Sequence, residues 1–427
     1  AGAGGGRVEA GRRRAGRARG GGGGAGTDGG RHGAGGGAGE SDEAETEEVS
    51  GRRAPPAGTC MVMGTASTMA CMTEALGMML PGGAAIPAVA ADRLRHAEAA
   101  GGRAVEMALE KLTPDRIMTP ESIANAFRIM LAIGGSTNGL VHMTAIAGRL
   151  GIEVDLDALD AMGRETPVLV DLKPSGRHYM EDLEKAGGLV TVLRELKPLL
   201  NLDCLTVTGK TLGENIDAAP PAWPQEVVRP FDDPLFAEGG IAVLRGNLAP
   251  DGAIIKQSAA SPELMRAEGR AVVFDSLADL AARIDDPDLD VRADDFLVLR
   301  NAGPKGAPGM PEMLQPTSAL VGMRLDHSVA MVTDGRFSGG TKGLSIGHCS
   351  PEAASGGPIA AVQEGDEITI DIPNSSIHLH LSDEEIALRL SAIPPFEARI
   401  KGGYLERYSF MVSSASTGAI LQVPTSV

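Results

Sequence analysis

Between residues 59 and 215, apolar residues recur every three or four positions, the spacing that places them on one face of an α-helix. Residues 65–80 follow this spacing behind candidate Ser and Thr caps. The stretch 119–133 begins with a cap, a proline at the first helical position and an acidic residue. Further helices are predicted after the Gly-Gly-Ser-Thr-Asn run, ending before Gly151, and at 155–162 and 179–185. We therefore expect this region to be rich in helices.

After a proline cluster at 220–224, the pattern changes to short apolar runs separated by Gly, Asn and Asp turns, which is typical of β-strands. Strands are predicted at 241–244, 253–255, 271–274, 296–299, 329–332, 368–372 and 377–381. Pro250-Asp251-Gly252 is expected to form the turn between the first two, and Ser382 with Glu385 forms a capping box that opens a late helix. Many short strands with few helices predict a β-barrel or a β-sandwich, with a domain boundary near 216–225.

The first 57 residues differ in composition from the rest of the chain. Glycine, alanine and arginine dominate residues 1–40, and an acidic run follows. Such a segment buries too little apolar area to offset its ordering entropy, so we expect it to be disordered. A secretory signal is excluded because an apolar core is missing, whereas an Arg-rich transit peptide stays open. An Arg/Gly tail that binds RNA and a wrong-frame translation of GC-rich DNA stay open as well.

Composition excludes several classes of protein. The 427 residues are 43% hydrophobic, which is enough for a large core and for two or three domains. The apolar runs fall far short of the about 18–20 residues that a membrane span needs, so we expect no membrane partner. The net charge of −17 argues against a nucleic-acid partner, and 4 cysteines do not make a disulfide scaffold.

Two glycine-rich segments in the helical region carry candidate chemistry. Residues 58–67 place Cys60 between glycines before a helix start, where a thiolate is favoured and can bind a metal. A small buried cysteine in a tight turn is the alternative. The free N–H groups of Gly134–Asn138, at a helix start, can hold an anion, although a simple cap uses the same residues.

Two more such segments lie among the predicted strands. Residues 301–312 form a turn-rich loop that ends in Glu312, a carboxylate able to hold Mg²⁺ or simply to face solvent. Residues 333–341 place Ser338 between glycines after a strand, where backbone can approach a ligand closely, or where a plain turn is formed. The remaining polar candidates, His378, His380, Cys71, Cys204 and Cys349, are interpreted as surface or structural residues.

In this order, the four segments resemble the dihydroxy-acid dehydratase / 6-phosphogluconate dehydratase family. The resemblance runs from about residue 58 to the end of the chain. It rests on GTCMVMGTASTMACMTEALGM (58–78), IGGSTNGLVHMTAIA (133–147), GNLAPDGAIIK (246–256), RNAGPKGAPGMPEM (300–313) and TDGRFSGGTKGLSIGHCSPEAASGGPIA (333–360). Within the family, DGRFSGGT and the C-terminal GYLERYSFMVSSASTGAIL look most like dihydroxy-acid dehydratase, whereas GTCMVMGTASTM and GNLAPDGAIIKQSAASPEL are closer to sugar-acid dehydratases.

The resemblance implies an α/β fold in which the helix-rich remnant of an α/β N-terminal domain (58–220) precedes a β-barrel-like C-terminal domain (221–427). It implies elimination of water from a 2,3-dihydroxy carboxylic acid of the 2,3-dihydroxyisovalerate type, in branched-chain amino-acid biosynthesis. Residue by residue, it implies that Cys60 binds an iron–sulfur cluster, [2Fe–2S] or [4Fe–4S], and that Glu312 binds Mg²⁺. Ser338 then matches the catalytic base, and Ser338, Gly339 and Thr341 contact the substrate.

The resemblance also implies a homodimer or higher homo-oligomer in the cytoplasm, or in a plastid or mitochondrion of a eukaryote. The family places two further cluster cysteines, and a Cys-Asp-Lys segment that binds Mg²⁺, upstream of Cys60. No cysteine precedes Cys60 here, and no lysine precedes Lys111. We therefore expect this chain to be an incomplete and inactive fragment. A sugar-acid (aldonate) dehydratase of the same family, and a non-catalytic remnant that binds a partner chain, are the alternative functions.

Overall fold

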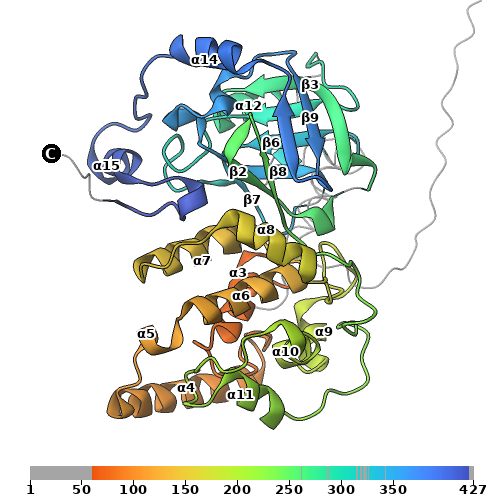
Figure 1. Cartoon of the computed structure of the whole chain (residues 1–427), viewed down its shortest axis with the longest axis vertical. Coiled ribbons are helices and arrows are strands. Elements are labelled where there is room, and N and C mark those ends of the chain that lie inside the picture. Colours follow the sequence, from red (N-terminus) through yellow and green to blue (C-terminus); the bar gives the residue numbers. More distant parts are fainter. Residues whose placement is uncertain are drawn as a thin grey trace, which may run out of the picture.

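The computed structural model describes residues 60–422, except 261, 285, 287, 314–315, 318–319, 321–324, 326 and 342. Figure 1 shows a helical part at one end of the molecule and a strand-rich part at the other. The segment 1–57, for which the sequence predicts disorder, lies outside the described residues. None of the described helices is long and apolar enough to cross a membrane.

The helical part confirms the predicted richness in helices between 59 and 215. Its helices are α3 (Thr65–Ala75), α4 (Ala91–Glu110), α5 (Pro114–Ile117), α6 (Pro120–Ala132), α7 (Asn138–Arg149), α8 (Leu156–Glu165), α9 (Met180–Lys185), α10 (Leu189–Glu195), η1 (Lys197–Leu199) and α11 (Leu212–Ala218). Its described residues form isolated β-bridges, and none of them belongs to a longer β-strand. That this part derives from a larger α/β domain stays a prediction.

The ends of these helices follow from local side-chain chemistry. Thr119 and Ser122 form a reciprocal capping box at the start of α6, and Pro120 occupies the first helical position. The side chain of Asp155 caps α8. The helix predicted at 65–80 begins at Thr65, as expected, but its N-cap is Gly64, without a side-chain hydrogen bond, instead of a Ser or Thr. Its predicted end is wrong, because α3 ends at Ala75. Gly77 follows at a φ of +84°, which breaks the helical path.

The strand-rich part resolves the choice between barrel and sandwich, because eight strands form a closed barrel in the order β1-β10-β9-β3-β4-β6-β8-β2. The strands are β1 (Ala242–Gly246), β2 (Ala249–Ile255), β3 (Arg266–Phe274), β4 (Phe296–Leu299), β6 (Ala330–Thr333), β8 (Ser345–Ser350), β9 (Glu367–Asp371) and β10 (Ser376–Leu379). Strands β3, β4, β6 and β8 pair in parallel, and the pairs β1·β2, β2·β8, β3·β9 and β9·β10 are antiparallel. The chain is therefore α/β, with helices and a closed barrel.

Shorter elements complete this part of the chain. A separate two-stranded sheet pairs β5 (Glu312–Met313) with β7 (Arg336–Phe337), and α12 (Leu277–Arg283) follows β3. The late helix α14 (Asp383–Ser391) begins as predicted, since Ser382 accepts a hydrogen bond from the Glu385 N–H. Helix α15 (Gly403–Met411) follows, and the short 3₁₀ turns are η2 (Gln257–Ala259), η3 (Pro262–Leu264), η4 (Ala353–Ser355), η5 (Pro358–Ala361) and η6 (Ala415–Thr417).

One predicted turn is wrong. Pro250, Asp251 and Gly252 lie within β2, and the chain reverses direction around Asn247 instead. The side chain of Asn247 explains the position of the turn: its amide nitrogen donates to the Leu379 carbonyl, and its oxygen accepts from the Leu379 N–H. Pro250 is tolerated in the strand because it lies near its start, at an exposed position.

Strand β4 shows why a short, continuous apolar run predicts a β-strand in this part of the chain. Phe296 and Val298 belong to the hydrophobic core inside the barrel, whereas Leu297 and Leu299 pack outside it against residues of α12 and the strands beside it. All four side chains are buried because alternate residues of a strand point to opposite faces. A strand that is buried on both faces therefore appears in the sequence as a continuous apolar run.

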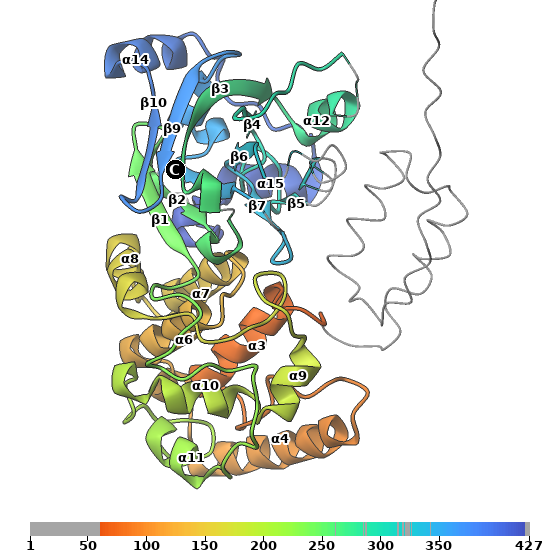
Figure 2. The ribbon, with the colours of Figure 1, turned by 90° about the vertical axis from the view of Figure 1, so that its right-hand side faces the viewer.

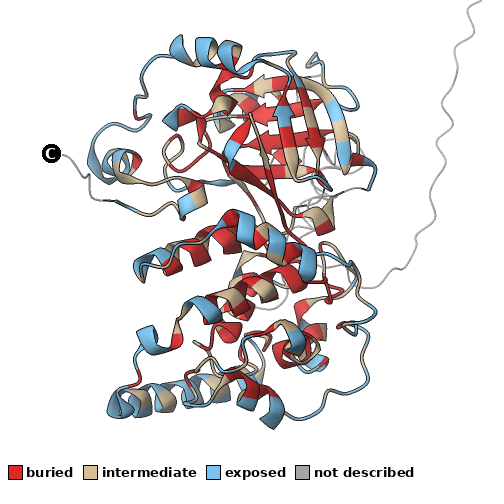
Figure 3. Ribbon diagram, viewed as in Figure 1, coloured by how far each residue is buried: buried red, intermediate tan, exposed pale blue. Residues whose placement is uncertain are grey.

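The two parts share one hydrophobic core. Val243 of β1 and Ile254 of β2 belong to the same buried cluster as Met130 of α6, Met143 of α7 and Leu159 of α8. Figure 3 shows buried residues on these helices and on the strands of the barrel, and Figure 2 shows the boundary between the two parts from a perpendicular direction. This shared cluster fixes the seam between helices and barrel, and the loops that carry the candidate chemistry lie along that seam.

Candidate active site

Glycine-rich segments from both parts touch at the seam. A Cβ atom placed on Gly339 would lie 2.8 Å from Gly64 Cα and 2.8 Å from Ser136 Cβ, closer than atoms can approach. The loop after β7 therefore packs against both the start of α3 and the loop before α7, and it does so because position 339 has no side chain. Three of the four segments singled out in the sequence meet here.

Asn138 brings in the fourth segment. Its side-chain nitrogen Nδ2 lies 2.6 Å from Glu312 Oε1, 2.9 Å from Thr65 Oγ1 and 3.1 Å from the Phe337 carbonyl oxygen. Thr65 Oγ1 lies 3.0 Å from Ser136 Oγ, which extends the network to the loop before α7. One amide group at the start of α7 thus contacts α3, β5 and β7, the elements that carry or adjoin the predicted site residues. This network is the interaction that the structure shows at the start of α7. Anion binding by Gly134–Asn138 stays a prediction.

Glu312 lies at the exposed start of β5, with its backbone opposite Arg336 in the parallel β5·β7 pair. Arg336 donates from Nε to the Met310 carbonyl oxygen at 2.5 Å, so it holds the end of the loop that precedes Glu312. His142, one turn after Asn138, faces both charges. Its pKa is lowered, first by burial and then by Arg336, although Glu312 opposes the shift.

Two buried carboxylates hold the loop 301–312. Asp334 accepts hydrogen bonds from the N–H groups of Asn301 and Ala302 at 3.1 and 2.8 Å. Glu352 accepts from those of Lys305 and Gly306 at 2.9 Å. Burial raises the pKa of Glu352 to about 7, against the lowering effect of these hydrogen bonds, and burial likewise raises the pKa of Asp334.

Ser338 is half-buried and lines a small cavity of about 20 Å³ at the seam. Gly339, Thr341 and Lys256 line the same cavity. The Lys256 ammonium nitrogen Nζ lies 3.3 Å from the Gly339 carbonyl oxygen, and burial lowers the pKa of Lys256 to about 7, opposed by the nearby Cys60. The hydroxyl of Thr341 is buried and has no hydrogen-bond partner among the described residues.

Cys60 is exposed at the start of the described chain, and its carbonyl oxygen accepts a hydrogen bond from Ser67 Oγ at 3.1 Å. A Cβ atom placed on Gly64 would lie 3.0 Å from Cys60 Sγ, so the thiol lies beside the residue against which Gly339 packs. The structure therefore gathers Ser338, Gly339, Thr341 and Lys256 around one cavity, with Cys60 near Gly64 at the same seam. Glu312 joins this seam through Asn138. The roles of these residues stay predictions.

Sequence models of both parts of one enzyme family match this chain. The N-terminal model of the dihydroxy-acid/6-phosphogluconate dehydratase family matches residues 30–215, and the C-terminal model matches residues 226–419. The chain belongs to this dehydratase family. The match begins upstream of residue 58, where the sequence analysis places the start of the resemblance, in a region outside the described residues.

Curated relatives agree with this assignment. The dihydroxy-acid dehydratase of Caldicellulosiruptor bescii is 49% identical over 386 residues, which cover 90% of this chain and 69% of the relative. The dihydroxy-acid dehydratase of Methanococcoides burtonii is 50% identical over 367 residues, covering 85% of this chain and 66% of the relative. A dehydratase is a hydro-lyase, so the chain belongs to a family of hydro-lyases.

The iron–sulfur cluster that the resemblance to this dehydratase family implies needs several thiolates. The chain has 4 cysteines, and Cys71 and Cys349 are buried in separate hydrophobic clusters, where burial raises the pKa of each thiol. Cys204 lies 3.7 Å from Asn125 on α6. Cys60 is thus the single thiol near the contact between Gly64 and Gly339, and the residues of this chain do not by themselves fit a cluster.

The same test gives a similar result for Mg²⁺. Glu312 supplies one carboxylate, and Asn138 Oδ1 is a buried oxygen without a partner among the described residues. Groups of three or more His, Cys, Asp or Glu side chains able to hold a metal are not found in the described part of the chain. One carboxylate is a partial ligand set for Mg²⁺.

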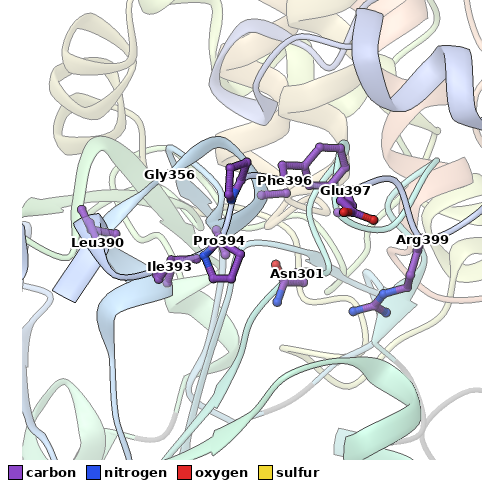
Figure 4. Close-up of a pocket in the computed structure, with 13 residues that line it drawn as sticks. Asn301, Gly356, Leu390, Ile393, Pro394, Phe396, Glu397 and Arg399 are labelled. Carbon is purple, nitrogen blue, oxygen red and sulfur yellow. The ribbon is translucent and has the colours of Figure 1, made fainter.

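The cavity in Figure 4 is larger but lies elsewhere. Its volume is about 440 Å³, and it lies behind the loop 301–312, lined by Asn301, Leu390, Ile393, Phe396 and Arg399 among others. None of the predicted site residues lines it. The larger cavity is thus separate from the predicted site residues.

Sequence reasoning missed Lys256 and the central position of Asn138. Lys256 directly follows the buried run Ala253–Ile255, and a charged residue at the end of an apolar strand is a usable signal. Asn138 lies within a segment that the sequence singled out, but its contacts join residues up to 199 positions apart. Such contacts exist only once the barrel and the helices meet.

The adjacent glycines at 339 and 340 provide a matched test of the packed seam. Gly339→Ala is expected to lower the melting temperature, because its Cβ would collide with the backbone of Gly64. Gly340→Ala should change the melting temperature little, since a Cβ there meets no atom within 4 Å. Thermal unfolding followed by circular dichroism measures both. Equal melting temperatures for the two variants would contradict the contact.

Glu352 predicts a pH dependence of stability. Its folded pKa of about 7 lies above the unfolded value of about 4.5, so its contribution is present below pH 4.5 and is lost as the pH rises through 7. The free energy of unfolding of the wild type, minus that of Glu352→Gln, should therefore fall between pH 4.5 and 7, by at most about 1.4 kcal/mol per pH unit. Urea unfolding at several pH values measures this difference. A difference that is constant with pH would refute the assignment.

Proposed function

We propose that this chain carries the base-bearing part of an enzyme that removes water from a 2,3-dihydroxy carboxylic acid to give a 2-keto acid. The observation that carries the proposal is that the four glycine-rich segments meet at one seam. Gly64 and Gly339, which pack against each other there, are 275 residues apart in the sequence. The residues predicted to act on substrate line one cavity there, and Glu312 is bonded into the same network.

In the proposed reaction, Ser338 as an alkoxide takes the proton from C2 of the substrate. The electron pair of that C–H bond forms the C2=C3 double bond, and the 3-hydroxyl leaves as hydroxide and takes up a proton to become water. The enol that remains tautomerises to the 2-keto acid. A base on a glycine-flanked turn suits this step, because the substrate carbon must come within hydrogen-bond distance of Oγ.

We propose a 2,3-dihydroxyisovalerate-type acid of branched-chain amino-acid biosynthesis as the substrate. Support comes from the names of the relatives, which are dihydroxy-acid dehydratases, and from the DGRFSGGT form of the segment that carries Ser338. The sugar-acid alternative rests on the GTCMVMGTASTM segment around Cys60.

We further propose that Cys60 and Glu312 are single donors to an iron–sulfur cluster and to Mg²⁺, whose other ligands this chain does not supply. The chain alone is then inactive. Anaerobically purified protein, reconstituted with iron, sulfide and Mg²⁺, should hold far less than one cluster per chain and form no 2-keto acid. Iron and acid-labile sulfide analysis measures this, and a stoichiometric cluster would contradict the proposal.

A chimera tests the base and the substrate together. In it, this chain replaces the matching part of the Caldicellulosiruptor bescii dehydratase, whose unmatched part is retained. We expect the chimera to convert 2,3-dihydroxyisovalerate, and Ser338→Ala in the chimera to lower kcat at least about a hundredfold, the range for loss of a positioned base. Iron content should stay unchanged in that variant.

Two controls sharpen the chimera experiment. Ser345→Ala changes a second serine that lines the same cavity but is the first residue of β8, and it should keep most of the activity. An aldonate is offered as the alternative substrate. Turnover of the aldonate without turnover of the branched acid would replace the substrate proposal, and full activity of Ser338→Ala would refute the base.

A further inference from the structure

Helix α4 carries apolar side chains that the rest of the chain leaves uncovered. In Figures 1 and 2 it lies along the end of the helical part that is farthest from the barrel, and none of its 20 residues is buried. Leu94, Val105 and Leu109 are 75%, 63% and 80% exposed. Single exposed apolar residues are common on protein surfaces, whereas several on one helix face are typical of an interaction surface.

The spacing of these three residues puts them on one face of the helix. Val105 and Leu109 follow Leu94 by 11 and 15 residues, which are about three and four helical turns. Arg103 follows Leu94 by nine residues and therefore lies on the opposite side. That side faces the helical part, because Arg103 Nε donates to the Val207 carbonyl oxygen at 2.6 Å. The apolar residues thus form an outer face of α4, turned away from the molecule.

Two adjacent glycines lie in the middle of α4. Gly101 and Gly102 occupy positions at which glycine is less favourable to a helix than alanine. The described part of the chain gives no steric reason for them, since a Cβ atom on either would meet no atom within 4 Å. At Gly339, by contrast, the missing side chain allows two segments to touch. A helix centre without side chains suits the close approach of a second helix from outside the chain.

The residues of the outer face are arranged symmetrically about these glycines. Leu94 lies seven residues before Gly101. Leu109 lies seven residues after Gly102. Two antiparallel copies of α4, related by a two-fold axis at the glycines, would therefore bring Leu94 of each copy against Leu109 of the other. A two-fold interface uses the same patch on both subunits, so a self-complementary order of this kind fits a second copy of the chain.

The charges beside the outer face agree with this arrangement. Arg95 and Glu106 are 11 residues apart, so they flank the face on the same side, and they are 68% and 64% exposed. The antiparallel pair would place Arg95 of each copy near Glu106 of the other, whereas a parallel pair would place like charges together. Arg95 also pairs with Asp92, and Glu106 with Arg103, so the new contacts would join these ion pairs into a network.

We propose that the outer face of α4 binds the same face of a second copy of this chain, as an antiparallel helix pair centred on Gly101 and Gly102. This inference goes beyond the proposed function and does not depend on it. It gives the homo-oligomer predicted from the sequence a defined surface. One helix from each copy is a small contact compared with the about 1,200–2,000 Å² buried in stable interfaces, so we expect association at micromolar concentrations.

Analytical ultracentrifugation of the purified full chain, between about 1 and 100 μM, measures the association. We expect the mass to rise with concentration toward that of two chains. Leu109→Asp should raise the dissociation constant at least about tenfold, because a carboxylate would be buried in an apolar contact. Leu388→Asp is the matched control: Leu388 is 65% exposed on α14, and this variant should associate like the wild type. Glu98→Ala, which removes an exposed carboxylate from the outer face, should associate more tightly.

Disulfide cross-linking tests the orientation of the pair. An equimolar mixture of the Leu94→Cys and Leu109→Cys chains should form a disulfide between positions 94 and 109, which mass spectrometry of peptides identifies. Leu94→Cys alone should form no disulfide between two copies of position 94, because the antiparallel pair holds them about 20 Å apart, far beyond the reach of a disulfide. Both substitutions replace exposed residues, so the fold should be retained.

Three results would overturn the proposal. The first is a chain that stays monomeric at the highest concentration. The second is a dimer that Leu109→Asp does not weaken, which would place the contact elsewhere on the surface. The third is a disulfide between two copies of position 94 in place of one between positions 94 and 109. If circular dichroism shows that Leu109→Asp does not fold, the cross-linking result decides.

Discussion

The hydrophobic cluster shared by the helices and the barrel is the constraint on which the candidate site depends. Val243 and Ile254 on the barrel pack with apolar residues of α6, α7 and α8, so the two parts cannot shift without exposing buried surface. Each fully buried aliphatic side chain of this kind contributes about 1.5–3 kcal/mol. The polar contacts of the seam are weaker, and they are ordered because the apolar cluster has already set the distance between the two parts.

Within that frame, close backbone approach and one amide group assemble the site. Gly339 lets the Ser338 loop lie against Gly64, and Asn138 joins Thr65, Glu312 and Phe337. Two buried carboxylates, those of Asp334 and Glu352, accept hydrogen bonds from backbone N–H groups of the loop that leads to Glu312. The loop that leads to Glu312 is therefore held by buried groups that do not line the Ser338 cavity.

Much of the fold could be predicted from particular residues. The run Phe296–Leu299 was placed correctly because both of its faces are buried, and α6 because Thr119 and Pro120 mark its start. Strand β8 was missed, since its residues Ser345, His348 and Ser350 look polar although the last two are buried in the barrel wall. Helix α4 was missed for the opposite reason: none of its residues is buried, so an apolar face turned toward a core is lacking.

The sequence predicts the segments that form the candidate site, but it does not predict the contacts between them. Cys60, Glu312 and Ser338 were found because glycines and prolines mark the loops around them. The partnership of Lys256 with the Ser338 loop joins residues 83 positions apart, and it exists only through the closure of the barrel. The pattern of residues around either position gives no information about this contact, because neither residue is unusual in its own segment.

The shared cluster also has a consequence for the relative motion of the helices and the barrel. Enzymes with sites between two lobes commonly open by a hinge, which moves one lobe away from the other. Here such an opening would pull Val243 and Ile254 away from the helices and expose their cluster to water, at a cost far above thermal energy. The shared cluster therefore opposes a hinge motion between the helices and the barrel at this seam.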